Sequence, residues 1–226
     1  NIDAYKNAYI IVSIYLSDGS ETNPYIVNDA NDFWEINDNP SAHYRVMNNI
    51  DLSNTTYTGE RVITDFDGSI VTYQNNGTSY VYTLFGINLN SSVVNLFEDM
   101  KGSISNINFN VNYQYDIATS SDMYLGLINR NFGRLTNVSV VFNGNAEINV
   151  RQPSAPYIYF GALVAENRGK IEYSSNTIVG SQGNINLSGN AVTYFGGLVG
   201  RNLSIITGYD DSNANANILN ANYSLN

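Results

Sequence analysis

Residues 194–202, YFGGLVGRN, decide the fold of this chain, because the chain repeats them. Residues 159–167 read YFGALVAEN, and residues 124–131 read YLGLINRN. Aligned on their final asparagines, the copies lie 36 and 35 residues apart. A period of this length is typical of solenoids, propellers and other arrays, in which each unit buries its apolar face against its neighbours. The repeat therefore predicts an architecture, and it lowers the expectation of a conventional enzyme.

Each repeated unit holds three short stretches of strand-forming residues. In the third unit we expect strands at 158–164, 170–173 and 184–187, separated by turns at 167–169 and 180–183. Three strands and small turns per period predict a right-handed parallel β-helix of about four to five coils, in which equivalent strands pair about 4.8 Å apart. A β-propeller is the competing interpretation, but its blades need four antiparallel strands in roughly 40–50 residues.

The repeated phrase has a structural interpretation at every position. Its Phe, Leu and Val side chains supply apolar mass to the core, and its two central glycines leave room where backbones approach or bend. The final asparagine ends the strand, tolerates a left-handed conformation and can bond to its own backbone. Stacked in successive coils, Asn131, Asn167 and Asn202 would form an internal asparagine ladder.

The N-terminal part predicts a cap on this solenoid. Residues 5–16 are β-branched and aromatic and predict a strand. A helix is expected to begin at Asn28 or Asp29, with the apolar residues up to Ile36 on one face, and to end at 37–40. Such a cap hides the apolar end of the first coil. We therefore divide the chain into an N-terminal strand and helix cap, 1–61, and a parallel β-helix, 62–226.

Further strands are expected on both sides of that boundary, together with a turn at 66–69. The expected segments are 24–27, 44–47, 50–52, 80–85, 93–97 and 104–111.

Composition narrows the class of protein. Only 13% of the residues are charged and 43% are hydrophobic, so the chain is not a disordered tail. The formal net charge of -10, with scattered basic residues, argues against nucleic acid and anionic membranes as partners. Cysteine is absent, which excludes disulfides and thiolate metal sites. No stretch is apolar for long enough to insert into a membrane, and the first residue is Asn; we expect a piece of a longer chain.

The repeated phrases resemble the GLUG motif of bacterial surface proteins. The best match is 197–202, GLVGRN; in 162–167 Ala replaces both outer glycines, and in 126–131 Asn129 takes the place of the second Gly. Residues 24–53 are similar to the first segment of many extracellular parallel β-helices. Proteins with this repeat include large adhesins and the non-catalytic regions of bacterial immunoglobulin A peptidases. The resemblance implies an extracellular or cell-surface location.

The sequence assigns no catalytic, cofactor-binding or metal-binding residue. The single histidine, His43, follows Pro40 in a polar loop, and one histidine without cysteine argues against a zinc site. Asp65 and Asp67 share a face if extended, where they would bind Ca²⁺ or form an acid–base pair; the alternative is a turn with solvated carboxylates. The pairs Asp210-Asp211 and Glu98-Asp99 are expected in a loop and in a surface turn.

Two sets of side chains recur at repeat positions. Arg130, Glu166 and Arg201 occupy one position, which predicts an Arg–Glu–Arg ladder on a solvent face, worth about 1 kcal/mol. Tyrosines recur near strand starts, where they either bind glycan or protein or cover the edges of the core. These are Tyr113, Tyr115, Tyr124, Tyr157, Tyr159 and Tyr194.

Three functions remain open. The first is a non-catalytic surface module, a stalk or adhesive solenoid that binds a host glycan or protein. The second is the substrate-recognition domain of a secreted immunoglobulin A peptidase. The third is a carbohydrate-active β-helix enzyme that uses Asp65 and Asp67.

Overall fold

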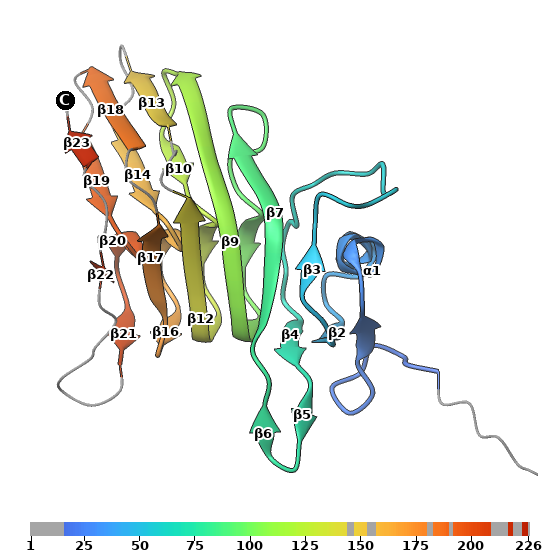
Figure 1. The fold of residues 1–226 in the computed structure, drawn as a ribbon. Helices are drawn as coiled ribbons and strands as arrows, with labels where there is room; N and C mark the ends of the chain where they lie inside the picture. Colours follow the sequence, from blue (N-terminus) through green and yellow to red (C-terminus); the bar gives the residue numbers. More distant parts are fainter. Residues whose placement is uncertain are drawn as a thin grey trace, which may run out of the picture.

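The chain forms a mostly-β parallel solenoid of about four turns with one short N-terminal helix (Figure 1). This is a computed structural model, and it describes residues 16–143, 147–152, 157–179, 183–189, 192–208, 217–218 and 223–225. The expected parallel β-helix is confirmed. A strand was expected at residues 5–16, and of these only residue 16 belongs to the described part.

One long sheet of 14 strands runs the length of the solenoid and begins in the cap. Its members pair in parallel, each with the equivalent strand of the next coil. They are β1 (Tyr25–Val27), β2 (His43–Val46), β3 (Ile50–Asp51), β4 (Ser69–Thr72), β7 (Tyr82–Asn90), β9 (Ser103–Ala118), β12 (Arg134–Asn143), β13 (Glu147–Gln152), β16 (Lys170–Glu172), β17 (Ser175–Val179), β18 (Gly183–Gly189), β21 (Ile205–Thr207), β22 (Asn217–Ile218) and β23 (Tyr223–Leu225).

Two smaller parallel sheets complete the coils. The three-stranded sheet joins β10 (Met123–Leu125), β14 (Tyr157–Gly161) and β19 (Val192–Gly196). The four-stranded sheet joins β8 (Phe97–Met100), β11 (Ile128–Asn131), β15 (Val164–Asn167) and β20 (Val199–Asn202).

The repeated phrase bends at its middle, which corrects the single strand expected at 158–164. β14 ends at Gly161 and β15 begins at Val164, so Ala162 and Leu163 form a corner between the two smaller sheets. A Cβ on Gly196, at the equivalent bend, would overlap Val199 O, so only glycine fits there. The expected strand at 93–97 is also wrong, because β8 begins only at Phe97.

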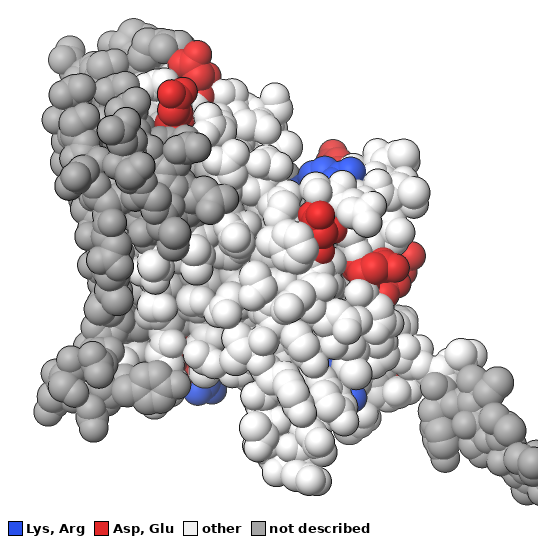
Figure 2. Space-filling view, viewed as in Figure 1, with Lys and Arg blue, Asp and Glu red and all other residues white. Residues whose placement is uncertain are grey.

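The core consists of alternate side chains stacked in register between coils. One column contains Ile70, Ile104, Leu135 and Ile171, each a Cα partner of the next and each fully buried. The outward positions of the same strands carry mainly polar side chains. Figure 2 shows one face, over β7 and β9, on which uncharged side chains prevail.

The expected N-terminal helix is confirmed. α1 (Ala30–Trp34) continues into a 3₁₀ turn, η2 (Glu35–Asp38). The Asp29 carboxylate accepts hydrogen bonds from the backbone N–H groups of Asn31 and Asp32, at 2.8 and 3.1 Å, which is an N-cap. Phe33 and Ile36 are fully buried in the same core cluster as Ile104. The long sheet is continuous from β1 through β2 and β4, so cap and solenoid share one sheet; the division at residue 61 stays a prediction.

One hairpin interrupts the first coil. β5 (Gln74–Asn75) and β6 (Thr78–Ser79) pair antiparallel around Asn76 and Gly77, both with positive φ. Asn-Gly favours the tight hairpin turn that needs two such residues. The hairpin projects from the body of the solenoid (Figure 1).

A bend in the long sheet predicts a stabilising substitution. Asn106, Asn137 and Tyr173 occupy the same place in successive coils, and all three have φ between 52° and 60°. Asparagine tolerates this conformation, whereas a bulky side chain is strained there by about 1–2 kcal/mol. We expect Tyr173→Asn to raise the free energy of unfolding by about 0.5–1 kcal/mol in urea titrations. The reciprocal Asn137→Tyr should lower it, and a stability loss in Tyr173→Asn would contradict the assignment of strain.

Candidate functional site

A row of stacked tyrosines follows the outer side of the three-stranded sheet. Tyr124, Tyr159 and Tyr194 are Cα partners in β10, β14 and β19. Their ring centroids are 4.6 and 5.1 Å apart, with planes inclined by only 17° and 11°. Tyr157 stacks on Tyr159 at 5.9 Å and is 37% exposed. Burial is the main cause that raises the pKa of Tyr124 and of Tyr159 above the usual range.

Two of the tyrosines grouped with this row lie elsewhere. Tyr113 and Tyr115 point inward from β9 and are buried. Their hydroxyls donate to Ala162 O at 2.5 Å and Val94 O at 2.6 Å. Burial raises the pKa of both hydroxyls, which are core groups and not members of a binding surface.

A row of alternating charge follows the four-stranded sheet beside the tyrosines. Asp99, Arg130, Glu166 and Arg201 are successive Cα partners in β8, β11, β15 and β20. Arg130 binds both carboxylate oxygens of Asp99, at 2.7 and 3.0 Å. Glu166 accepts from Arg168 at 2.5 Å and from Arg201 at 3.3 Å. The row therefore contains ion pairs between successive coils.

The network differs from the expected Arg–Glu–Arg ladder in two respects. Arg130 turns to Asp99, one coil earlier, whereas Glu166 pairs with Arg168 and Arg201. Glu166 is fully buried, whereas the expectation placed it on a solvent face. A buried carboxylate needs nearby positive charge, so Glu166 depends on Arg168 and Arg201 for compensation. Glu98-Asp99 lies in strand β8 and not in a surface turn, which corrects that expectation too.

Guanidinium groups connect the charged row to the aromatic row. Arg201 lies over the rings of Tyr159 and Tyr194, at 5.7 and 5.6 Å, and donates to the Tyr159 hydroxyl at 3.3 Å. Arg130 lies 6.0 Å from the ring of Tyr124. Arg130 and Arg168 both approach the ring of Phe132, which is 40% exposed. We call the combined surface the Tyr–Arg face: Tyr124, Tyr157, Tyr159, Tyr194, Phe132, Asp99, Arg130, Glu166, Arg168 and Arg201.

An asparagine ladder fixes the strands below this face, as the repeat predicted. The Asn131 amide donates to Asn167 Oδ1 at 2.7 Å, and the Asn167 amide donates to Asn202 Oδ1 at 2.8 Å. Asn131 and Asn167 are fully buried. Asn131 Oδ1 also accepts from the backbone N–H of Gly133 at 3.1 Å. None of these three described residues has the positive φ for which asparagine was expected to suit the position.

The Tyr–Arg face combines aromatic rings, guanidinium groups and carboxylates. Three arginines face the carboxylates of Asp99, Glu166 and the adjacent Asp122, which accepts from the Tyr157 backbone N–H at 3.2 Å, so the charges balance on a chain whose net charge is -10. Tyr159 lies between the rings of Tyr124 and Tyr194 and is only 2% exposed, so the ring edges and hydroxyls of the more exposed Tyr124, Tyr157 and Tyr194 remain to contact a ligand. Tyrosine and arginine are also among the residues most enriched at the positions that dominate binding energy in protein interfaces.

The carboxylates considered for catalysis are placed at a turn. Asp65 has a φ of 50° and forms an ion pair with Lys101 at 2.5 Å. Its hydrogen bond to Lys101 raises the pKa of that amine. Asp67 is exposed, and its backbone N–H donates to Pro40 O at 3.2 Å. Asp210 and Asp211 lie outside the described residues.

The described part of the chain offers neither a metal centre nor a membrane-spanning helix. No three His, Asp or Glu side chains gather in that part as they would around a metal ion. No described helix has the length and apolarity needed to cross a membrane. His43 Nδ1 lies 2.7 Å from Ser69 Oγ, so the histidine has a hydroxyl partner.

Sequence reasoning missed three members of the Tyr–Arg face: Asp99, Phe132 and Arg168. Asp99 precedes Arg130 by 31 residues, a shorter step than the 36 and 35 residues of the recognised copies. The coil that contains Asp99 lacks the Gly-Leu phrase, so the sequence did not show that Asp99 aligns with Arg130. Arg168 lies just after its strand, and only the turn geometry aims it back at Glu166.

Comparison with known proteins gives a structural likeness. No family model and no curated protein matches the chain, so its resemblance to GLUG proteins rests on the motif residues. A solved structure from Bacteroides ovatus, described as "a putative immunoglobulin A1 protease", is similar with a TM-score of 0.45 and 12% sequence identity. The likeness covers 88% of this chain and 83% of that one.

Proposed function

We propose that the chain is a non-catalytic module of a bacterial cell-surface or secreted protein, a solenoid that binds a host protein through the Tyr–Arg face. One observation carries the proposal: the strand register places the charged row beside the tyrosine row, so that the arginines contact both the carboxylates and the aromatic rings. Each arginine is held by a carboxylate and by a ring, so little side-chain entropy is lost when a partner binds. The surface is therefore organised before it meets its ligand.

The geometry favours protein over glycan at this face. Sugars bind aromatic residues by lying flat on an open ring face, and here the faces of Tyr124, Tyr159 and Tyr194 are stacked on one another. Ring edges, hydroxyls and guanidiniums suit the carboxylates and backbone carbonyls of a polypeptide.

The test is a binding screen against purified host plasma and matrix proteins, with a glycan array alongside, using the wild-type chain and two face variants. We expect one or more proteins to bind, and we expect Tyr194→Ala and Arg201→Gln each to weaken that binding by about 30-fold, as for residues that dominate an interface. Binding should also weaken as salt concentration rises.

Tyr80→Ala and Arg61→Gln serve as matched controls, because Tyr80 is 45% exposed and both residues precede the coils that carry the face. Melting curves by circular dichroism should show that all four variants remain folded. The proposal fails if no host protein binds, or if the face variants bind as tightly as the controls. Glycan capture that depends on Tyr194 and Arg201 would replace the protein by a sugar ligand.

A further inference from the structure

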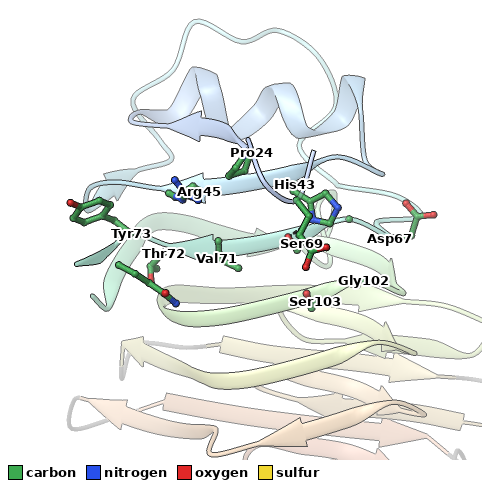
Figure 3. A pocket seen from close by; sticks show the side chains of 13 residues that line it. Pro24, His43, Arg45, Asp67, Ser69, Val71, Thr72, Tyr73, Gly102 and Ser103 are labelled. Atoms are coloured by element: carbon green, nitrogen blue, oxygen red, sulfur yellow. Dashed lines mark hydrogen bonds between the residues drawn. The ribbon is translucent and has the colours of Figure 1, made fainter. Parts of the chain in front are cut away.

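A polar groove of about 720 Å³ lies on the outer side of the long sheet, next to the cap (Figure 3). Its floor consists of outward side chains from three adjacent parallel strands, β2, β4 and β9. Tyr73 and Gln74, at the base of the β5–β6 hairpin, border one side of the groove. Glu21 and Pro24 of the cap border another. The hairpin and the cap thus form two borders of the groove, and the sheet forms its floor.

The strand register arranges the floor in rows. His43, Ser69 and Ser103 are successive Cα partners, and the next outward residues, Arg45 and Val71, are partners two positions along. Equivalent atoms in such a row are about 4.8 Å apart. Figure 3 shows Arg45 and Tyr73 toward one end of the groove, and His43, Ser69 and Asp67 toward the other.

Arg45 differs from the other basic residues of the described chain. Eight Lys and Arg side chains are described, and seven of them make an ion pair, a hydrogen bond to a carbonyl or a cation–π contact. Within that set Arg45 alone has none of these, although it is partly buried on the groove floor. A guanidinium offers five donors in a planar fork that matches a carboxylate.

The remaining lining suits a ligand rich in hydroxyl groups. Ser69, Ser103 and Gln74 can donate and accept hydrogen bonds, and the carboxylates of Glu21 and Asp67 accept from hydroxyls. Two carboxylates on the rim also oppose a ligand with many negative charges, such as a polyphosphate. At the Arg45 end an aromatic ring is supplied by Tyr73, which is supported by Tyr80 at a centroid distance of 5.7 Å.

From these features we propose that the groove binds a short acidic oligosaccharide, with one sugar carboxylate on Arg45 and sugar hydroxyls on the His43–Ser69–Ser103 row. The site is separate from the Tyr–Arg face, which is built from later coils, and does not depend on the function proposed for that face. It would give the solenoid a second, chemically different contact with glycan-bearing surfaces.

The test measures binding of two sugars with a single carboxylate, sialyllactose and a xylotriose that bears one methylglucuronate, each against its neutral counterpart, lactose and unsubstituted xylotriose. We expect isothermal titration and saturation-transfer NMR to detect at least one carboxylated sugar, with its neutral counterpart at least about tenfold weaker. Arg45→Gln should reduce that affinity at least about tenfold, and Arg45→Lys should restore part of it. Arg61→Gln is the matched control and should leave binding unchanged, as should Tyr194→Ala on the Tyr–Arg face.

Four results would overturn the proposal. They are the absence of binding by either carboxylated sugar at millimolar concentration, equal binding of the neutral sugars, unchanged affinity in Arg45→Gln, and stronger Arg45-dependent binding of a poly-glutamate peptide. Far-ultraviolet circular dichroism of each variant verifies folding, so loss of binding in a folded Arg45→Gln protein reports on the groove. Loss of host-protein binding in the Tyr194 and Arg201 variants would leave this result unaffected.

Discussion

Replacement of Gly133 by alanine is expected to lower the free energy of unfolding by about 3 kcal/mol or more. Gly68, Gly102, Gly133 and Gly169 form a column at one turn of successive coils, and a Cβ on each would overlap backbone atoms of the preceding coil. On Gly133 it would overlap Gly102 O and lie 2.5 Å from Lys101 O. Both neighbours are backbone atoms next to paired strands, so they yield only if the coils separate. A single methyl group at this turn therefore disrupts the stacking itself.

Gly77→Ala is the matched control for this loss. A Cβ on Gly77 meets no atom within 4 Å, and the φ of 78° alone accounts for its cost, about 1 kcal/mol. Urea titrations followed by circular dichroism give both values. If Gly133→Ala does not fold, Gly169→Ala takes its place in the comparison with Gly77→Ala. Gly169 lies one coil later, and a Cβ there would overlap Gly133 O. Equal stability of Gly133→Ala and Gly77→Ala would show that the coils are not in close contact at this turn.

Loss of the central rung of the asparagine ladder is the second large effect. Asn167→Ala removes both inter-coil hydrogen bonds and leaves the buried Asn131 amide without an acceptor. An unpaired buried polar group costs about 1–3 kcal/mol beyond the lost bonds. We expect the free energy of unfolding to fall by about 2–4 kcal/mol in urea.

Asn202→Ala removes the exposed end of the same ladder and provides the control. Asn202 is exposed, so water can take its place as the acceptor for the buried Asn167 amide, and we expect a cost of about 1 kcal/mol. Equal free energies of unfolding for Asn167→Ala and Asn202→Ala would show that the buried rung of the ladder stabilises the fold no more than the exposed one.

The repeat carries most of what the sequence could predict. A phrase that recurs at a nearly constant interval places Asn131, Asn167 and Asn202 above one another without further information, and their hydrogen bonds follow from that placement. The cap helix was equally accessible, because an Asp N-cap before apolar residues three to four apart is a local signal. Both predictions rest on patterns that can be read in one sequence, because they are either local or repeated.

Two kinds of feature could not be predicted in this way. One is the face of a long strand on which a side chain lies, and the other is structure that depends on irregular or inserted segments. β9 is a 16-residue strand, and whether Tyr113 points inward depends on the alternation counted from its start. The partner of Arg130 depends on a first coil that lacks the repeated phrase. The groove around Arg45 depends on an inserted hairpin that borders it, and no motif in the sequence marks this groove.

In-register stacking of coils underlies the core, the ladder and both proposed surfaces, and a cysteine-free chain allows it to be tested by paired cysteines. Ser69 and Ser103 are Cα partners on β4 and β9, whereas Ser105 lies two residues further along β9 on the same outward side. A disulfide requires Cα atoms about 4.4–6.8 Å apart, and a shift of two residues places them beyond that range. Under native oxidising conditions, this stacking predicts that Ser69→Cys/Ser103→Cys loses its free thiols to Ellman's reagent and that Ser69→Cys/Ser105→Cys keeps them. Free thiols in the first pair, or a disulfide in the second, would contradict it.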